Sequence, residues 1–335
     1  MRRSRVIGLG THLPDRVVTN DDLAELMDTS DEWITQRTGI RERRWVDPGT
    51  TTTDLGLEAA TRALDDAGLT PGDVDMIVFA TLSPDHEFPG NACFLQAKLD
   101  VPGIPAMDVR QQCSGFIYAM STADAMIRVG NADTVLVVGA EVHSKGLDLS
   151  DAGRDVSVLF GDGAGAVVVQ ATEVNDARHD PHVWSTHLHA DGSFADALWL
   201  PAPGMAYDRF MTEDLLARGL QYPQMDGRTV FVNAVRHMPE AVEEAMTEHG
   251  IEADDIDLFV FHQANMRIIE AAVHRLGIPT DKVVNTIHET ANTTAATIPL
   301  CLEAAREQGK LEPGTLVAAA AFGSGFTWGS MLLRW

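Results

Sequence analysis

One segment of the chain recurs in similar form 182 residues later. Residues 59–79 and residues 241–261 both read as an amphipathic helix, a glycine, a short acidic loop and an apolar strand. Gly68 of the first copy falls on Gly250 of the second. The recurrence predicts that one α/β unit is present twice.

A second pair of strands keeps the same offset. The apolar run 134–139 falls on the apolar run 316–321. Continuous apolar strands that alternate with helices are typical of parallel sheets covered by helices on both faces. We therefore predict two related α/β halves, residues 1–172 and residues 173–335.

Charge and hydropathy restrict the partners of this chain. Hydrophobic residues make up 45% of 335, which is enough to form a large core. No apolar run approaches the roughly 18 residues that span a bilayer, and the apolar stretch 6–10 behind the basic start 1–5 is too short for a signal peptide. A formal net charge of −24 repels nucleic acid and anionic membranes. We therefore expect a cytoplasmic protein without a nucleic-acid or membrane partner.

The three cysteines differ in their sequence settings. Their odd number and wide spacing argue against a disulfide framework or a zinc site. Cys93 and Cys301 lie in apolar helical patterns, which predicts buried packing for both. Cys113 precedes a helical pattern that runs toward Val129 and stops at Gly130. The positive end of that helix favours a thiolate nucleophile, although a small buried residue is the alternative.

Two further polar residues lie where α/β sheets place active sites, beyond the carboxyl ends of strands. His262 directly follows the buried strand that ends at Phe261, and Asn292 precedes another helix. A histidine satisfied by a backbone hydrogen bond and an asparagine that caps a helix are the alternatives. Taken alone, neither residue defines a site.

Two glycine-rich clusters, residues 160–166 and 322–329, lead into extended segments. Nucleotide-binding motifs instead place their glycine loop between a strand and a helix. The clusters favour close approach of the backbone to a substrate, and the second could aim an N–H group at an oxyanion. His187 and His189 lack a third cluster of ligands, so no metal site is predicted.

A helix is predicted to begin near Thr29, which fits a capping box with Glu32. Trp33 and Arg37 are four residues apart and therefore share one face of this helix. An exposed tryptophan beside an arginine can stack on a planar base and bind phosphate. A simple cation–π surface pair is the alternative.

Together these segments resemble β-ketoacyl-[acyl carrier protein] synthase III, a family of condensing enzymes in the thiolase superfamily. The matching motifs cover nearly the whole chain and are highly specific in combination: Thr29–Ile34, Arg37–Arg43, Cys113–Phe116, Phe160–Ala166, His262–Asn265, Asn292–Ala296 and Phe326–Ser330. The resemblance implies an acyltransferase with an α/β, thiolase-like fold of five αβαβα layers. It also implies no cofactor, since acyl-CoA is a substrate.

The resemblance implies a two-step reaction that initiates fatty acid biosynthesis. Cys113 attacks an acyl-CoA thioester, and the backbone N–H groups of Cys113 and Ser324 hold the oxyanion. A malonyl-acyl carrier protein then loses CO₂. His262 and Asn292 stabilise the enolate, which attacks the acylated cysteine.

The resemblance also implies binding residues. Trp33 and Arg154 would sandwich the CoA adenine, and Arg37 would contact its phosphate. Arg267 would dock the carrier protein together with Arg275. Phe88 matches a residue that closes the acyl pocket of the partner in a homodimer.

The chain departs from the family pattern at several positions. Val232 stands where some members carry a basic docking residue, and His274 and Arg275 occupy two other docking positions. Arg43 is a further candidate for a basic docking patch. Ser324 replaces a glycine, so its backbone conformation is in question. Residues 198–228 form a longer segment than in enzymes with short primers, which could reshape the acyl pocket.

Other members of the superfamily offer alternatives. A thiolase is disfavoured because no second cysteine lies near the C-terminal glycine loop, and the loop typical of plant polyketide synthases is absent. A non-catalytic partner subunit is disfavoured by the presence of Cys113. The serious alternative is a secondary-metabolism enzyme of the same scaffold with a medium-chain or aryl primer.

Overall fold

The first sheet is built from the N-terminal part of the chain. The computed structural model describes residues 1–335. The strands of this sheet follow the order β1-β7-β6-β4-β5 and are β1 (Arg2–His12), β4 (Met76–Ala80), β5 (Ala106–Val109), β6 (Thr134–Glu141) and β7 (Gly163–Glu173). Strand β4 is parallel to β5 and β6, whereas β7 is antiparallel to β6 and β1.

The second sheet repeats this plan with later strands. Its order is β11-β12-β13-β8, from β8 (His182–Ala190), β11 (Leu258–Phe261), β12 (Leu316–Gly323) and β13 (Thr327–Arg334). Strands β11 and β12 are parallel, as β4 and β6 are. A parallel bridge between Phe259 and Val283 stands where β5 lies in the first sheet. The equivalent strands lie at the offset that the sequence predicted.

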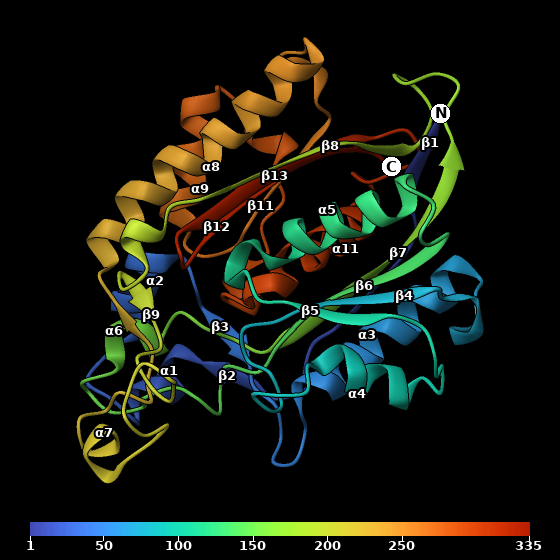
Figure 1. Ribbon diagram of the computed structural model, residues 1–335. Helices are drawn as coiled ribbons and strands as arrows, with labels where there is room; N and C mark the ends of the chain where they lie inside the picture. Colours follow the sequence, from blue (N-terminus) through green and yellow to red (C-terminus); the bar gives the residue numbers. More distant parts are fainter.

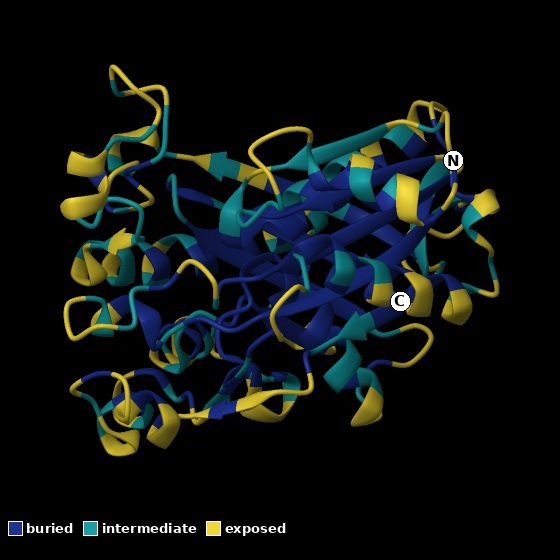
Figure 2. Cartoon of the chain, turned by 90° about the horizontal axis from the view of Figure 1, so that it is seen from below, coloured by how far each residue is buried: buried dark blue, intermediate teal, exposed yellow.

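Helices form three layers around the two sheets (Figure 1). Helices α5 (Gly115–Arg128) and α11 (Thr297–Glu307) lie between the sheets, α3 (Thr52–Ala67) and α4 (Asn91–Lys98) cover the first, and α8 (Gly227–His249) and α9 (Met266–Leu276) cover the second. The expected five-layer αβαβα arrangement is therefore confirmed. Buried residues concentrate in the central layers (Figure 2).

The remaining elements are short. They are α1 (Asn20–Ala24), α2 (Asp31–Thr38), α6 (Arg154–Ser157), α7 (Glu213–Ala217) and α10 (Ile287–Thr290), with the ribbons β2 (Val17–Thr19)–β3 (Glu42–Arg44) and β9 (Leu198–Trp199)–β10 (Gln224–Met225). Six 3₁₀ turns complete the chain; η2 (Gln112–Ser114) and η6 (Thr294–Ala296) matter for the site. No helix has the length and apolar character that a membrane crossing requires.

One core joins the two sheets. Its largest cluster of buried residues includes Val78 of β4, Val317 of β12, Ile117 of α5 and Ile298 of α11. These side chains are each at most 1% exposed. The two middle helices are apolar on more than one face because they pack against both sheets. Residues at the carboxyl ends of strands from both sheets are thereby held close together.

Two local predictions were wrong. Helix α2 begins at Asp31, and Ser30 rather than Thr29 caps it by accepting a hydrogen bond from the Trp33 N–H group. Cys93 is exposed rather than buried, since it lies on the outer side of α4, whereas Cys301 is fully buried as predicted. An apolar helical pattern does not by itself say which side faces the core.

Candidate active site

Cys113 lies in the turn η2, between strand β5 and helix α5. It is two residues before the first residue of α5, as the predicted helix start required. The neighbouring Ser114 hydroxyl lies 2.8 Å from the Thr327 hydroxyl, and it donates to the Gln111 carbonyl oxygen at 2.9 Å. These contacts tie the cysteine turn to strand β13 of the second sheet.

Gly323 approaches Cys113 so closely that no side chain fits there. A Cβ atom at Gly323 would lie 2.7 Å from the Cys113 Cβ and 2.9 Å from its backbone nitrogen. The backbone N–H groups of Ser324 and of Cys113 itself lower the pKa of the Cys113 thiol, which places both groups near its sulfur. The expected departure at Ser324 causes no strain, because its φ lies outside the left-handed region that favours glycine. Its hydroxyl donates to the Leu198 carbonyl oxygen.

Burial opposes the thiolate that the helix start favours. It raises the pKa of Cys113 to about 12, and the nearby carboxyl of Glu141 adds to the rise. That carboxyl is fully buried and accepts hydrogen bonds from the Ser83 and Thr81 hydroxyls at 2.5 and 3.1 Å. The nearby backbone N–H groups have the opposite effect and lower the pKa of Cys113. Burial is the largest of these effects, so the resting side chain is a neutral thiol.

The raised pKa of Cys113 should make its reaction with alkylating reagents depend strongly on pH. Alkylation of Cys113 by iodoacetamide should accelerate about tenfold for each pH unit between pH 7 and 10, because the thiolate fraction rises that steeply below the pKa. Peptide mass spectrometry can follow Cys113, with the exposed Cys93 in the same molecule as the internal control. A Cys113 rate that is already constant at pH 7 would contradict the raised pKa.

His262 follows strand β11 and is 2% exposed. Its backbone N–H donates to the Ala320 carbonyl oxygen at 2.8 Å. Its Nδ1 lies 2.7 Å from the hydroxyl oxygen of Thr297, whereas its Nε2 is buried and has no partner within the protein. Burial lowers the pKa of His262 to about 3, so the imidazole is neutral at physiological pH. A neutral ring with one free nitrogen remains available to a ligand.

Asn292 is fixed by contacts on both sides. Its backbone N–H donates to the Leu159 carbonyl oxygen, and its carbonyl accepts from the Gly161 N–H group. Its Oδ1 accepts a hydrogen bond from the Thr294 N–H group at 2.8 Å. The side-chain oxygen is therefore occupied by the backbone, and the amide nitrogen remains free to donate.

Backbone strain is concentrated around these residues. Four non-glycine residues have positive φ, and three of them are Gln112 (φ 46°), Ala291 (φ 54°) and Thr294 (φ 52°). They flank Cys113 and Asn292. Such strain costs on the order of 1–3 kcal/mol for each residue and is characteristic of functional sites.

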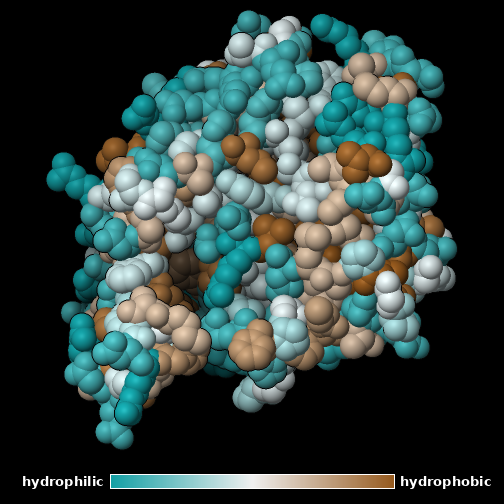
Figure 3. Space-filling view, in the orientation of Figure 1, coloured by the Kyte–Doolittle hydropathy of each residue, from teal (hydrophilic) through white to brown (hydrophobic).

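Cys113, His262 and Asn292 line one cavity of about 430 Å³. The Cys113 turn comes from the first half of the chain, and the other two residues come from the second. Most other lining residues are apolar, among them Val158, Leu159, Phe160, Leu198, Met225, Val230, Phe231, Ala234, Met238, Ile268 and Phe322. A hollow with a hydrophobic interior is visible on one face of the molecule (Figure 3). The cavity thus combines a few polar groups with apolar walls, as ligand sites do.

Trp33 lies at the same cavity with arginines beside it. The Arg37 and Arg154 guanidinium carbons are 4.6 and 4.7 Å from the centre of the Trp33 ring. Arg37 lines the cavity, whereas Arg154 stands beside it and donates to the Asp28 carbonyl oxygen at 2.8 Å. The cation–π arrangement considered from the sequence is therefore present, with Arg154 as a second arginine beside the ring.

Three arginines at the cavity have no acidic partner: Arg37, Arg228 and Arg267. The guanidinium carbon of Arg267 lies 5.5 Å from the Phe231 ring centre. Arg228 was not singled out in the sequence, although it stands one residue after the start of α8. In a chain of net charge −24, these residues form a local cationic rim.

The other arginines proposed for docking differ in availability. Arg43 is fully buried and donates to the Val18 and Val158 carbonyl oxygens, so its assignment to a surface patch was wrong. Its chain neighbours show no apolar pattern that would have predicted this burial.

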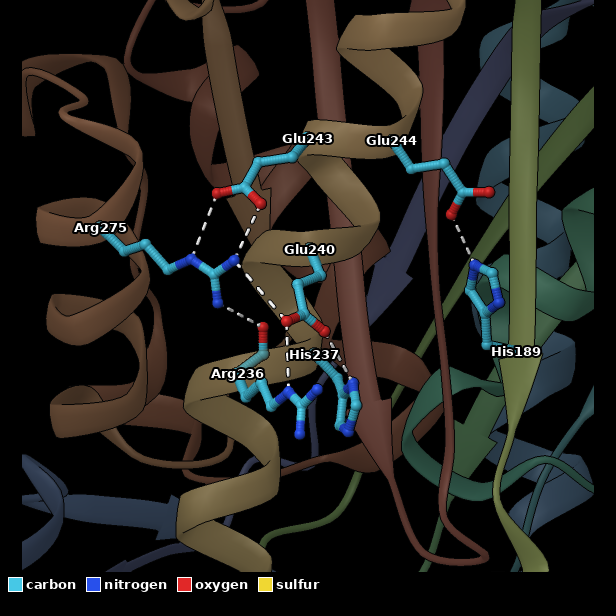
Figure 4. A network of polar contacts seen from close by, with 7 residues as sticks. All are labelled: His189, Arg236, His237, Glu240, Glu243, Glu244 and Arg275. Carbon is cyan, nitrogen blue, oxygen red and sulfur yellow. Dashed lines mark hydrogen bonds and ion pairs between the residues drawn. The ribbon is translucent and has the colours of Figure 1, made fainter.

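Arg275 is engaged by acidic residues of α8 (Figure 4). Its guanidinium contacts both carboxyl oxygens of Glu243 at 3.2 and 2.8 Å and lies 3.7 Å from Glu240. The next residue of α8, Glu244, points away from Arg275 and pairs with His189 of β8 at 2.6 Å. Arg275 is thus already neutralised within the chain.

Phe88 does not reach this cavity. Its side chain is 86% exposed, although large apolar side chains are usually covered. Within a single chain it has no role in the site. Its expected contribution to a partner's pocket therefore remains a prediction.

Sequence reasoning missed the residues that hold the site together. The Gln263 side chain accepts from the Thr286 and Ile287 N–H groups and donates to the Phe261 carbonyl oxygen, which links the His262 loop to the segment before Asn292. Thr297, which contacts His262, belongs to the same Asn-Thr-Thr-Ala-Ala-Thr stretch as Asn292. Its polarity directly before the apolar run 298–302 was the available signal.

Comparison with known proteins agrees with this geometry. Residues 107–192 match the family described as 3-Oxoacyl-[acyl-carrier-protein (ACP)] synthase III, and residues 246–335 match its C-terminal part. The β-ketoacyl-[acyl-carrier-protein] synthase III of Xanthomonas campestris pv. campestris is 46% identical over 335 residues, which cover 99% of this chain and 98% of that protein.

Solved structures show the same fold. The 3-oxoacyl-[acyl-carrier-protein] synthase III of Aquifex aeolicus is 42% identical with a TM-score of 0.88, covering 99% of this chain and 100% of that one. A priming β-ketosynthase from a polyketide biosynthetic pathway is 32% identical with a TM-score of 0.87, covering 99% and 96%. The identity over nearly the full length exceeds what a shared fold alone produces, and the chain belongs to the β-ketoacyl-[acyl-carrier-protein] synthase III family of condensing acyltransferases.

Proposed function

We propose that the protein joins a short acyl-CoA primer to malonyl-acyl carrier protein by decarboxylative Claisen condensation and so initiates fatty acid synthesis. The observation that carries this proposal is one apolar cavity lined by Cys113, His262 and Asn292, with Trp33 and arginines at the same cavity. A thiol supports acyl transfer, and two polar side chains beside it support stabilisation of an enolate.

In the first half-reaction the Cys113 sulfur attacks the thioester carbonyl of the acyl-CoA. A carbon–sulfur bond forms to Cys113, the bond to the CoA sulfur breaks, and the thiol proton leaves with CoA. The tetrahedral oxyanion would accept hydrogen bonds from the backbone N–H groups of Cys113 and Ser324, which lie near the sulfur. The backbone of Gly323 lies so close to Cys113 that a side chain at this position would clash with it.

In the second half-reaction the malonyl thioester loses CO₂ and becomes an enolate. The free amide nitrogen of Asn292 and the unpartnered Nε2 of His262 would donate hydrogen bonds to the enolate oxygen. The carbanion attacks the acyl carbon, and the Cys113 thiolate leaves and takes a proton from water. Both half-reactions are complete with these groups and two thioester substrates, so no cofactor is needed.

Binding of the CoA adenine would require Arg154 to move. A planar base between two stacked groups needs about 7 Å, twice the contact distance of carbon atoms, whereas Arg154 stands 4.7 Å from the Trp33 ring centre. Arg37 would then meet the phosphate. The carrier protein would meet Arg267, and Phe88 would enter the acyl pocket of a second subunit in a homodimer.

A panel of acyl-CoAs tests the proposed function. The protein is incubated with acetyl-, medium-chain and aryl-CoA, and the mass added to the peptide that contains Cys113 is measured. Acetylation of Cys113, followed by release of a β-ketoacyl product with malonyl-acyl carrier protein, is the expected result. Acylation by medium-chain or aryl primers alone would overturn initiation of fatty acid synthesis and favour the secondary-metabolism alternative.

The two docking arginines should differ in effect. Arg267→Ala should raise the KM for malonyl-acyl carrier protein about threefold to fivefold, since an exposed ion pair contributes up to about 1 kcal/mol. Arg275→Ala is the matched control, because Glu243 already neutralises Arg275 and its loss should leave this KM nearly unchanged. Steady-state kinetics at low ionic strength measures both. Equal effects of the two variants would refute the distinction.

A further inference from the structure

The hydroxyl of Thr297 lies between two possible hydrogen-bond acceptors, one of which is the His262 ring. Thr297 is the first residue of helix α11 and is fully buried. Its hydroxyl oxygen lies 2.7 Å from Nδ1 of His262 and 2.9 Å from the Thr294 carbonyl oxygen. A hydroxyl carries one hydrogen, so it can donate to only one of these two acceptors.

The distances favour donation to the imidazole. Hydrogen bonds from hydroxyl groups cluster near about 2.7–2.8 Å, and those from N–H groups near about 2.9–3.0 Å. The separation of 2.7 Å between Thr297 and Nδ1 therefore fits a hydroxyl donor better than a ring N–H donor. The Thr294 carbonyl oxygen does not depend on the hydroxyl, because it already accepts the backbone N–H of Thr297.

We propose that Thr297 donates its hydroxyl hydrogen to Nδ1 of His262 and thereby keeps the ring hydrogen on Nε2, facing the cavity. The proposal rests on the proposed function and names Thr297 as a positioning residue for its second half-reaction. A neutral imidazole carries one N–H, so a donor at Nδ1 forces that N–H to the other nitrogen.

This tautomer is the one that an enolate requires. Nε2 is buried without a partner, and the neighbouring Asn292 presents its amide nitrogen because its oxygen is held by Thr294. With hydrogen on Nε2, both side chains offer donors to the same cavity. With hydrogen on Nδ1, the Nε2 lone pair would face the negative oxygen and repel it. Loading of Cys113 needs no donor from His262, so only condensation depends on the tautomer.

Nuclear magnetic resonance tests the tautomer without reference to activity. In protein labelled with ¹⁵N-histidine, correlations between ring nitrogens and ring hydrogens distinguish the protonated nitrogen from the unprotonated one. The signals of His262 are assigned by their loss in His262→Ala. We expect hydrogen on Nε2 in the native protein and a mixture or reversal in Thr297→Val. Hydrogen on Nδ1 in the native protein would overturn the proposal.

Two variants connect the tautomer to the reaction. Thr297→Val keeps the shape of the side chain but leaves a buried ring nitrogen unpaired, so the ratio of condensation rate to loading rate should fall about tenfold. Thr297→Ser restores the hydroxyl and should recover most of that ratio. Thr293→Val is the control, because the buried Thr293 hydroxyl has no partner in the protein. If Thr293→Val and Thr297→Val lower this ratio equally, the loss comes from altered packing, and the role proposed for the Thr297 hydroxyl is wrong.

Failure of this inference can be told apart from failure of the proposed function. If His262→Ala condenses at the native rate, the role proposed for His262 is wrong whatever its tautomer. If His262→Ala blocks condensation but the native spectrum shows hydrogen on Nδ1, the function stands and the assignment to Thr297 falls.

Discussion

Replacement of Cys113 by alanine should abolish acylation of the protein by acyl-CoA and with it all condensation. The reason is covalent: the acyl group has no other carrier in the cavity, since the remaining cysteines lie outside it. Removal of the nucleophile from such a site typically costs on the order of 10⁶-fold in rate. Intact-protein mass spectrometry after incubation with acetyl-CoA measures the loss.

Cys93→Ala is the matched control for this experiment. Cys93 is also a free cysteine, but it is exposed on the outer helix α4, away from the cavity. This variant should load and condense as the native protein does. If acylation survives in Cys113→Ala and disappears in Cys93→Ala, Cys113 is not the residue that carries the acyl group.

Replacement of Asn292 by alanine should leave loading intact and reduce condensation by about 10²–10³-fold, the usual effect of removing one donor to a developing oxyanion. The amide nitrogen of Asn292 is free because its oxygen accepts the Thr294 N–H group. The two half-reactions are measured separately, by mass spectrometry of acetyl-Cys113 and by CO₂ release from malonyl-acyl carrier protein.

Asn292→Asp separates the donor from the local fold. An aspartate retains the oxygen that accepts the Thr294 N–H group, but it replaces the amide nitrogen by a second oxygen. We expect it to fold like the native protein and to condense as poorly as Asn292→Ala. Native condensation by Asn292→Asp would show that the amide nitrogen is not the required group.

The repeated pattern predicted the architecture well because each copy carries complete local signals. Gly68 and Gly250 both end their helices with positive φ, at 67° and 60°, as glycines that stop helices do. The apolar strands that follow are fully buried in parallel pairs. Helix-ending glycines and the spacing of apolar residues depend on residues that are close in the chain, so both can be recognised in a sequence.

The sequence was a poorer guide to which charged side chains are free to bind a partner. Arg43 lies in a motif rich in arginine, yet it is the largest fully buried side chain of the protein, with its guanidinium bonded to backbone carbonyl oxygens. Burial lowers its pKa to about 10, which still leaves it charged. Arg275 is neutralised by Glu243, a residue of a different helix. The burial of Arg43 and the ion pair of Arg275 both depend on residues that are distant in the chain.

The sequence alone determined the duplicated α/β plan, the family resemblance and the residues that bear the chemistry, because these depend on local patterns and on residue type. The tertiary structure alone decided that Cys113, His262 and Asn292 line one cavity, that Asn292 presents its nitrogen, and that Thr297 reaches His262. It also decided which arginines remain unpaired. The physical reason is that hydrogen-bond direction, burial and charge pairing are set by neighbours in space, and the two sheets bring those neighbours together from opposite halves of the chain.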